Sequence, residues 1–350
     1  MAWIRLARTG LGYPACLDTG VKAVSRNFFI LIGGNMIDRI RDAVERDERL
    51  SEKPACIHSP SDYADGIFDM MDNPKAEEGL PLPWSSVPLT LKPETYLLTG
   101  IPSMGKSTWM DNIIVYSAQM HGYKWAVFSP ESYPVKKYLA KLIWVRLGKN
   151  IMGKYCIPPT KGDVERELDW LSGRVVVLDP KESDKAIDSL LLSVEWLVVN
   201  EGINAFLFDP YNEFSMTRPH NITETEYVSL FLGRIRSFVN THEVMAWIVA
   251  HPTKLRKEDV TYPDGTSRFD YAVPTAYDIS GSANFYNKPD NIIAVHRNKD
   301  RNTNPDNIVQ IRVWKARNNH EHEGEFLLHY NHRTNGFSSA TEEKEGSLYD

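Results

Sequence analysis

Gly100-Ile101-Pro102-Ser103-Met104-Gly105-Lys106-Ser107, continued by Thr108, is the stretch of sequence that decides the fold. It has the spacing of a phosphate-binding loop, in which two glycines separated by four residues precede a lysine and a hydroxyl residue. The apolar residues before it, 95–99, predict a buried strand, and residues 106–121 after it predict a helix. A strand, a glycine-rich loop and a helix in this order are the context that such a loop requires.

The residue types of this loop suit a nucleoside triphosphate with Mg²⁺. Glycines permit a tight turn whose backbone N–H groups point at phosphate oxygens, and the start of the helix adds a favourable dipole. Lys106 is expected to reach the outer phosphates, and the hydroxyl of Ser107 to bind Mg²⁺. The sequence therefore predicts that residues 100–108 bind ATP or a deoxynucleoside triphosphate.

Strand and helix patterns alternate on both sides of the loop, which predicts an α/β fold with a mainly parallel central sheet flanked by helices. The expected strands are residues 95–99, 125–129, 175–178, 205–208, 244–250, 292–296, 308–314 and 325–330. The expected helices are residues 106–121, 135–147, 187–199 and 223–240, the last capped by Thr223 with Glu226. Residues 252–277 are polar and punctuated by proline and glycine, so we expect a long loop there.

The sequence before the loop divides at a proline-rich stretch. Residues 1–60 are an N-terminal region of uncertain fold. Residues 61–90 are expected to form a linker helix, begun by Ser61 and presenting Ile67 and Met71 on one face, followed by the proline-rich connector. Residues 91–340 then form the core, and residues 341–350 a polar tail.

Composition limits the class of protein. Of the 350 residues 42% are hydrophobic and 25% charged, which is the balance of an ordinary globular protein. Cys16, Cys56 and Cys156 are widely spaced, which argues against a zinc site and for a reducing, cytoplasmic setting. The apolar run at residues 28–32 is too short to span a membrane. The net charge of −6 restricts any contact with nucleic acid to a local basic surface.

Polar residues follow three of the predicted strands. Asp209 ends the apolar run 205–208, Glu131 follows residues 125–129, and His251 follows residues 244–250. Because α/β sheets present ligand groups at the carboxyl ends of their strands, all three are expected near the phosphates. Asp209 could hold the Mg²⁺ shell, Glu131 could activate the attacking water, and His251 could sense the terminal phosphate. Each residue could instead be an ordinary polar residue of a turn.

Two groups of cations invite a role in binding. Lys254, Arg256 and Lys257 open the long loop and suit a nucleic-acid backbone, although a solvated loop would explain them equally well. Lys315 and Arg317 lie two positions apart at the end of a strand and so share one of its sides. They could reach into the active site of a neighbouring copy, or be only surface cations.

Read in order, these motifs resemble the RecA-fold motor domain of hexameric replicative DNA helicases of the DnaB type, in the branch of phage primase-helicases and Twinkle. The resemblance covers roughly residues 60–340. Besides the loop, it rests on the segments Phe128-Ser129-Pro130-Glu131, Phe208-Asp209-Pro210, His251-Pro252-Thr253-Lys254, Gly281-Ser282-Ala283, Val295-His296-Arg297-Asn298, Lys315-Ala316-Arg317 and Tyr330-Asn331.

The resemblance implies specific roles around the nucleotide. Glu131 resembles the catalytic glutamate, Asp209 the Walker B aspartate, and His251 the phosphate sensor that is coupled to DNA. Arg297 and Tyr330 resemble the pair that flanks the nucleotide base.

It also implies contacts outside a single chain. Lys315 and Arg317 resemble fingers that act on the neighbouring subunit of a homohexamer. Lys254 and the pair Gly281 and Ser282 resemble parts of the loops that grip single-stranded DNA.

The front of the chain departs from the family pattern, because only about 90 residues precede the core and no primase module is recognisable. The chain could therefore be a fragment, a truncated gene product or a helicase whose primase is supplied separately, and primase activity is not predicted. The expected location of this protein is the cytoplasm of a bacterial or phage-infected cell. Two other functions stay open at this point. One is a recombinase-type filament ATPase, and the other is a nucleotide-binding assembly or regulatory module without unwinding activity.

Overall fold

The computed structural model describes residues 57–74, 78–180, 185–215, 218–219, 221–253, 255, 257–261, 267–279, 283–298, 307–318 and 320–340. The chain forms two compact units, Met1–Glu77 and Glu78–Asp350. Most of the predicted N-terminal region and the polar tail lie outside the described residues. Among the described helices, none is long and apolar enough to cross a membrane.

The described part of the first unit is a short helical segment. A 3₁₀ turn, η3 (Pro60–Tyr63), leads into α4 (Ala64–Asp72). The N-cap of this segment is Ser59, and not Ser61 as the sequence suggested. The backbone N–H of Ser59 donates to Asp62 Oδ2 at 2.8 Å. Ile67 and Phe68 are more than half exposed, so α4 has apolar side chains that its own unit leaves uncovered.

The second unit is built on a nine-stranded sheet with the order β13-β12-β11-β10-β3-β7-β6-β4-β5. The strands from β10 to β5 in this order run parallel, whereas β11, β12 and β13 are antiparallel additions beyond β10. In chain order the strands of this sheet are β3 (Thr95–Thr99), β4 (Trp125–Phe128), β5 (Val175–Val177), β6 (Ala205–Phe208), β7 (Met245–Ala250), β10 (Asn291–His296), β11 (Ile308–Ala316), β12 (Gly324–Asn331) and β13 (Gly336–Ser339). The mainly parallel α/β fold expected from the sequence is confirmed.

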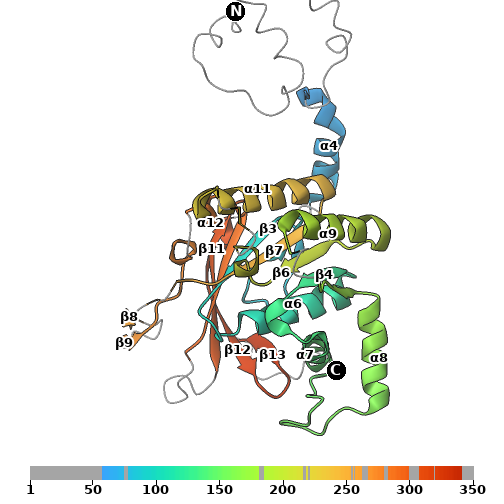
Figure 1. The fold of residues 1–350 in the computed structure, drawn as a ribbon, viewed down its shortest axis with the longest axis vertical. Helices are drawn as coiled ribbons and strands as arrows, with labels where there is room; N and C mark the ends of the chain where they lie inside the picture. The colour runs from blue at the N-terminus through green and yellow to red at the C-terminus, as the bar shows by residue number, and fades with distance from the viewer. Residues whose placement is uncertain are drawn as a thin grey trace, which may run out of the picture. The chain divides into compact units, whose positions relative to one another are not determined.

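Helices cover both faces of the sheet (Figure 1). One face packs against α6 (Lys106–Met120), α7 (Val135–Leu147) and α8 (Lys161–Ser172). The other packs against α9 (Ile187–Glu201), α11 (Glu224–His242) and α12 (Asn284–Asn287), and the short α10 (Asn212–Ser215) also lies on this side. Alternate residues of β7 supply the two cores, with Trp247 on the first face and Ile248 on the second. Since the parallel strands are buried on both faces, their sequences are continuously apolar.

Part of the predicted connector belongs to the core unit. Leu82, Trp84 and Leu89 are buried against the first face, and Trp84 Nε1 donates to the carbonyl oxygen of Phe337 at 3.0 Å. The small sheet of β1 (Leu80–Pro81) and β2 (Thr90–Leu91) lies in this stretch. The compact unit therefore begins at Glu78 and not near residue 91, because the apolar side chains between the prolines bury themselves in the core.

Helix-capping chemistry was readable from the sequence at α11. The backbone N–H of Thr223 donates to Glu226 Oε2 at 2.8 Å, and that of Glu226 donates to Thr223 Oγ1 at 3.2 Å. The capping box predicted for Thr223 and Glu226 is thus present. Thr160 and Asp163 form a similar box at the start of α8, a helix that was not expected from the sequence.

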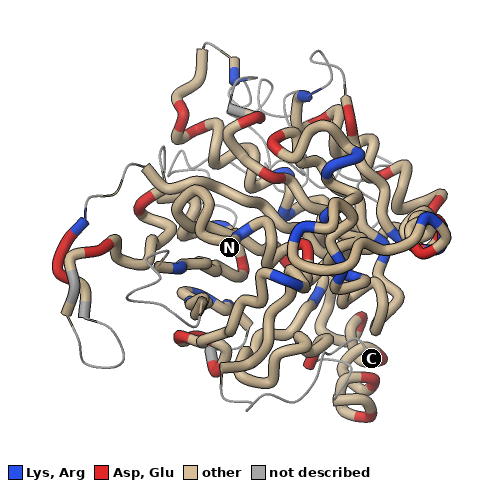
Figure 2. The backbone as a smooth tube through the Cα atoms, turned by 90° about the horizontal axis from the view of Figure 1, so that it is seen from below, with Lys and Arg blue, Asp and Glu red and all other residues tan. Residues whose placement is uncertain are grey.

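The stretch expected to be a long loop contains a hairpin. Its strands are β8 (Glu258–Thr261) and β9 (Ser267–Asp270), and they pair only with each other. Charged residues break the apolar alternation that would have marked these strands in the sequence. Figure 2 shows acidic and basic positions interspersed along the core, with acidic ones prominent in this hairpin. The remaining short 3₁₀ turns are η4 (Pro130–Ser132), η6 (Ala276–Asp278) and η7 (His320–His322).

Candidate nucleotide site

The glycine-rich loop joins the carboxyl end of β3 to the start of α6. Gly100 has φ of 150°, and a Cβ atom there would lie 2.3 Å from the carbonyl oxygen of Val295. Gly105 has φ of 105° and directly precedes α6. Both glycines are therefore required by backbone geometry, one by a close approach and the other by a left-handed conformation.

Lys106 is almost completely buried, with 4% of its surface exposed. Its Nζ donates to the carbonyl oxygens of Gly100 at 2.7 Å and Ile101 at 3.2 Å. Burial lowers the pKa of Lys106 to about 8, although the nearby carboxylates of Asp209 and Glu131 oppose this shift. A bound polyphosphate would place negative charge beside the buried Lys106 ammonium and so favour its protonated form.

Ser107 and Asp209 form a pair of hard oxygen ligands. Ser107 Oγ donates to Asp209 Oδ2 at 3.4 Å, from the start of α6 to the end of β6. Burial, together with repulsion from Glu131, raises the pKa of Asp209 to about 6. Asp209 Oδ1 is buried and has no hydrogen-bond partner within the described chain. This orphaned carboxylate oxygen beside a hydroxyl fits Mg²⁺, which takes few protein ligands and completes its shell with water and phosphate oxygens.

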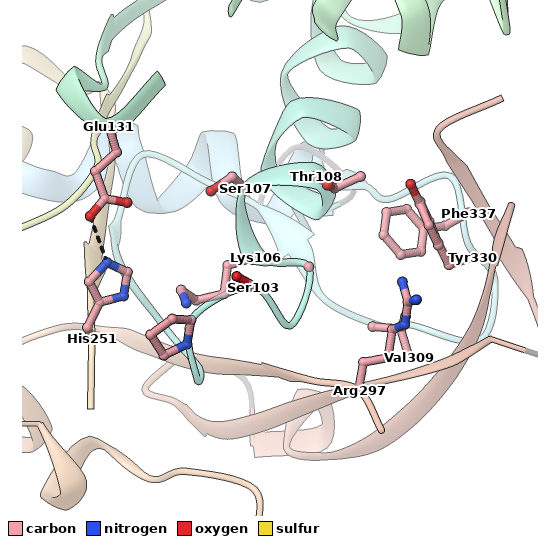
Figure 3. Close-up of a pocket in the computed structure, with 12 residues that line it drawn as sticks. Ser103, Lys106, Ser107, Thr108, Glu131, His251, Arg297, Val309, Tyr330 and Phe337 are labelled. Atoms are coloured by element: carbon pink, nitrogen blue, oxygen red, sulfur yellow. Dashed lines mark hydrogen bonds and ion pairs between the residues drawn. The ribbon is translucent and has the colours of Figure 1, made fainter. Parts of the chain in front are cut away.

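Glu131 and His251 meet beside the loop, from the ends of β4 and β7 (Figure 3). His251 Nε2 lies 3.3 Å from Glu131 Oε1. Burial lowers the pKa of His251, and so does Lys106, whereas Glu131 raises it. The side chain of Glu131 is 54% exposed, so water can reach its carboxylate.

A pocket of about 380 Å³ extends from the loop toward the antiparallel strands. On that side the Arg297 guanidinium carbon lies 5.0 Å from the centre of the Tyr330 ring. Figure 3 shows Val309 and Phe337 beside this pair, and neither was expected from the sequence. Phe337 was hidden because the four-residue strand β13 has too little pattern to be recognised. The pocket is lined by Pro102, Ser103, Gly105, Lys106, Ser107, Thr108, Glu131, His251, Arg297, Val309, Tyr330 and Phe337.

Lys315 and Arg317 lie at the edge of the sheet where its parallel strands begin. This pocket lies at the other edge, the carboxyl edge, where those strands end. The two cations stand at the end of β11, which runs antiparallel to β10, and Lys315 pairs with Ile292 at the beginning of β10. The parallel strands β10 and β3 end at the other edge, where the glycine-rich loop begins. The structure therefore does not bring these two cations to the pocket of their own chain.

Most of the predicted DNA-binding residues fall outside the described part of the chain. Lys254, Arg256, Gly281 and Ser282 are among them. Lys257 is exposed, and its Nζ lies 5.3 Å from the centre of the Tyr271 ring. Within the described residues, no group of three or more His, Cys, Asp or Glu side chains could hold a metal ion.

Comparisons with known proteins agree with this fold. No protein-family model matches the chain. The Twinkle homolog protein, chloroplastic/mitochondrial, of Arabidopsis thaliana is 35% identical over 253 residues, which are 71% of this chain and 34% of that protein. The chain thus spans about a third of the length of this curated relative.

The fold also has a counterpart among solved structures. An ATPase domain of known structure superposes with a TM-score of 0.62 at 14% identity, covering 79% of this chain and 98% of that one. At this identity the match establishes the fold, and the sequence relative independently supports the branch that the motifs suggested. The chain contains a RecA-fold domain of the DnaB helicase type, related in sequence to Twinkle.

Proposed function

We propose that this chain is a motor that hydrolyses ATP or a deoxynucleoside triphosphate, moves along single-stranded DNA and unwinds duplex DNA as a homohexameric ring. The observation that supports this most is the division of polar residues between two edges of one sheet. Lys106, Ser107 and Asp209 lie at the carboxyl edge, whereas Lys315 and Arg317 lie at the opposite edge. Cations placed there can serve a nucleotide only if it is bound by another copy, and a head-to-tail contact of this kind forms a closed ring when the rotation between copies closes and a helical filament when it does not.

Within one chain the residues divide the chemistry among themselves. Lys106 and the backbone of residues 100–107 would bind the phosphates, and Ser107 with Asp209 would hold Mg²⁺, which supplies charge neutralisation between the outer phosphates when bound. Glu131 would orient the attacking water and accept its proton, because its exposed carboxylate lies beside the loop. His251, at 3.3 Å from Glu131, would respond to the terminal phosphate and change the position of that carboxylate.

The neighbouring copy would complete the site. A guanidinium brought to the leaving phosphates stabilises the charge that develops in the transition state. Arg317 is proposed for this role, with Lys315 as its companion. Lys254, Arg256, Lys257, Gly281 and Ser282 are proposed to face the DNA, and the cytoplasm of a bacterial or phage-infected cell is the proposed location of this protein.

Steady-state hydrolysis of ATP and dTTP, measured with and without single-stranded DNA, tests the proposal. We expect strong stimulation by DNA, and the loss of all turnover in a Glu131→Ala control that still binds nucleotide. Turnover that is absent or indifferent to DNA would remove the helicase proposal and favour a nucleotide-binding assembly module.

Particle shape tests the ring separately. Electron microscopy with a nonhydrolysable nucleotide should show closed hexamers. Helical filaments on DNA would instead support the recombinase-type alternative, which uses the same core.

A further inference from the structure

Asp290 is a buried carboxylate that neither the nucleotide pocket nor the sequence motifs account for. It directly precedes β10, at the edge opposite the glycine-rich loop, and 6% of its surface is exposed. Its Oδ2 accepts from Thr95 Oγ1 at 2.7 Å and from the Thr95 backbone N–H at 3.2 Å. The backbone N–H of Asp290 also donates to Thr95 Oγ1 at 2.9 Å. These bonds fix the orientation of the carboxylate on the rigid start of the sheet.

The other oxygen of Asp290 faces two guanidinium groups. Asp290 Oδ1 lies 3.3 Å from Arg317 Nε and 3.4 Å from Arg236 Nη2. Arg317 Nη2 further donates to the carbonyl oxygens of Asn287 at 3.0 Å and Lys288 at 3.4 Å. Nη1 of Arg317 makes no hydrogen bond to any described residue. The guanidinium is thus held along one side by its own chain while its remaining terminal nitrogen is available to another molecule.

Lys315 is engaged differently. Its Nζ donates to the carbonyl oxygens of Tyr286 at 2.8 Å, Asn287 at 3.2 Å and Pro289 at 2.7 Å. An ammonium group has three protons, so this lysine uses its whole donor capacity within the chain. It holds the same turn that receives the Arg317 guanidinium, and binding a phosphate would require it to give up one of these bonds.

We propose that Asp290 is a positioning residue that presents Arg317 to the nucleotide of the neighbouring subunit, with Lys315 securing the turn behind it. The inference rests on the proposed function, in which Arg317 acts on the next copy. A long arginine side chain has many rotamers, and fixing its guanidinium beforehand places the charge where the transition state needs it. A misplacement of about 1 Å can cost about 100-fold in rate, so Asp290→Asn should lower kcat by about 10- to 100-fold with little change in KM.

Arg236 provides a matched control, because it contacts the same carboxylate oxygen at nearly the same distance and comes from α11. Arg236→Ala removes one of the two cations and leaves the Arg317 contact in place. We expect its DNA-stimulated turnover to stay within about twofold of the parent, whereas Asp290→Asn and Arg317→Ala both lose turnover. An Asp290→Asn chain that keeps full turnover while Arg317→Ala loses it overturns the inference and leaves the proposed function standing.

Mixed assemblies separate positioning from misfolding. A ring that combines Asp290→Asn chains with Glu131→Ala chains contains interfaces with an intact catalytic site on one side and an intact Arg317 on the other. Turnover should therefore reappear on mixing, as it should for Arg317→Ala mixed with Glu131→Ala. If mixing restores turnover for Arg317→Ala but not for Asp290→Asn, Asp290 does not act by positioning Arg317 for the neighbouring subunit. If mixing restores turnover for neither variant, the shared active site of the proposed function is overturned as well.

A second variant keeps the inference testable if Asp290→Asn folds poorly. Arg317→Lys retains the positive charge but cannot bridge Asp290 Oδ1 and the Asn287 carbonyl oxygen in the same way. We expect its turnover to be as low as that of Arg317→Ala. Parent-like turnover in Arg317→Lys would show that no fixed guanidinium is needed and would refute the role of Asp290.

Discussion

Buried charged residues lie at both edges of the parallel sheet, but their pairing within the chain differs between the two edges. At the carboxyl edge, Asp209 Oδ1 and His251 Nδ1 are buried without a hydrogen-bond partner among the described residues, and the pKa of Lys106 is lowered to about 8 by burial. At the opposite edge both oxygens of Asp290 are paired, with Thr95 and with two arginines. Unpaired buried groups cost free energy, and a ligand that pairs them recovers it. The carboxyl edge therefore has unpaired polar groups that a ligand can bind, whereas the side chains at the opposite edge are fixed by bonds within the chain.

Two lysines sharpen this contrast. Burial lowers the pKa of both Lys106 and Lys315 to about 8. Lys106 donates to two carbonyl oxygens of a loop that must turn its N–H groups toward phosphates, whereas Lys315 donates to three carbonyl oxygens of one turn. The same side chain therefore serves binding at one edge and structure at the other.

The largest expected effect belongs to the carboxyl edge. Glu131→Gln should lower the rate of hydrolysis by about 100- to 10,000-fold, because the amide cannot accept the proton of the attacking water. Nucleotide affinity and the unfolding midpoint should change little, since this side chain is largely exposed. Single-turnover hydrolysis, nucleotide titration and thermal unfolding measure the three quantities. If affinity fell in parallel with rate, Glu131 would be a binding residue and not a base.

The pH dependence of nucleotide binding tests the charge on Lys106. Its ammonium form binds phosphate, and with a pKa of about 8 it loses the proton as pH rises, so affinity should fall above pH 8 by up to about tenfold per pH unit. Nucleotide phosphates are already fully ionised in this range. Calorimetric titration with ADP in the absence of Mg²⁺ between about pH 7 and 9.5 measures the slope. Lys106→Met should bind weakly and without this slope, and constant affinity in the parent over the whole range would contradict the assignment.

A smaller effect, on stability, is expected at the opposite edge. Lys315→Met leaves three carbonyl oxygens without their donor and should lower the free energy of unfolding by about 2 kcal/mol. Urea unfolding with an unchanged dependence on denaturant measures it. Lys136→Met, on α7 and away from this edge, should cost almost nothing. Equal losses in both variants would mean that the three bonds of Lys315 contribute no net stability.

The smallest effect should come from a site that touches neither edge. Thr223→Ala removes the cap of α11 and should lower stability by about 1 kcal/mol without changing turnover. Thr241→Ala, near the other end of the same helix, loses only a bond to the Ser237 carbonyl oxygen and should be close to neutral. A change in turnover for Thr223→Ala would mean that strain in α11, which contains Arg236, reaches the residues around Asp290. The two edges would then not act independently of the rest of the fold.

Much of the fold was accessible to sequence reasoning because the parallel strands are buried on both faces. Continuous apolar runs such as residues 245–250 and a capping box such as Thr223 with Glu226 are local signals, and each predicted its element. The hairpin β8–β9 and the strand β13 were missed for the converse reason. The hairpin contains charged residues and pairs only with itself, and β13 has four residues, of which Phe337 packs against Trp84, 253 positions away.

By itself the sequence determined the phosphate-binding loop, since strand, glycines, lysine and helix are adjacent in the chain. It also placed Asp209, Glu131 and His251 at strand ends. Only the tertiary structure decided that β6, β4 and β7 lie in an order that brings these residues together, because apolar patterns do not encode which strands are neighbours.

The tertiary structure alone also decided where Lys315 and Arg317 lie. The end of β11 is at the edge opposite the nucleotide pocket because β11 runs antiparallel to β10, and the direction of a strand cannot be read from its side-chain pattern. Asp290 became visible for the same reason. Its partners Thr95, Arg236 and Arg317 are distant in sequence and meet only once the sheet has formed.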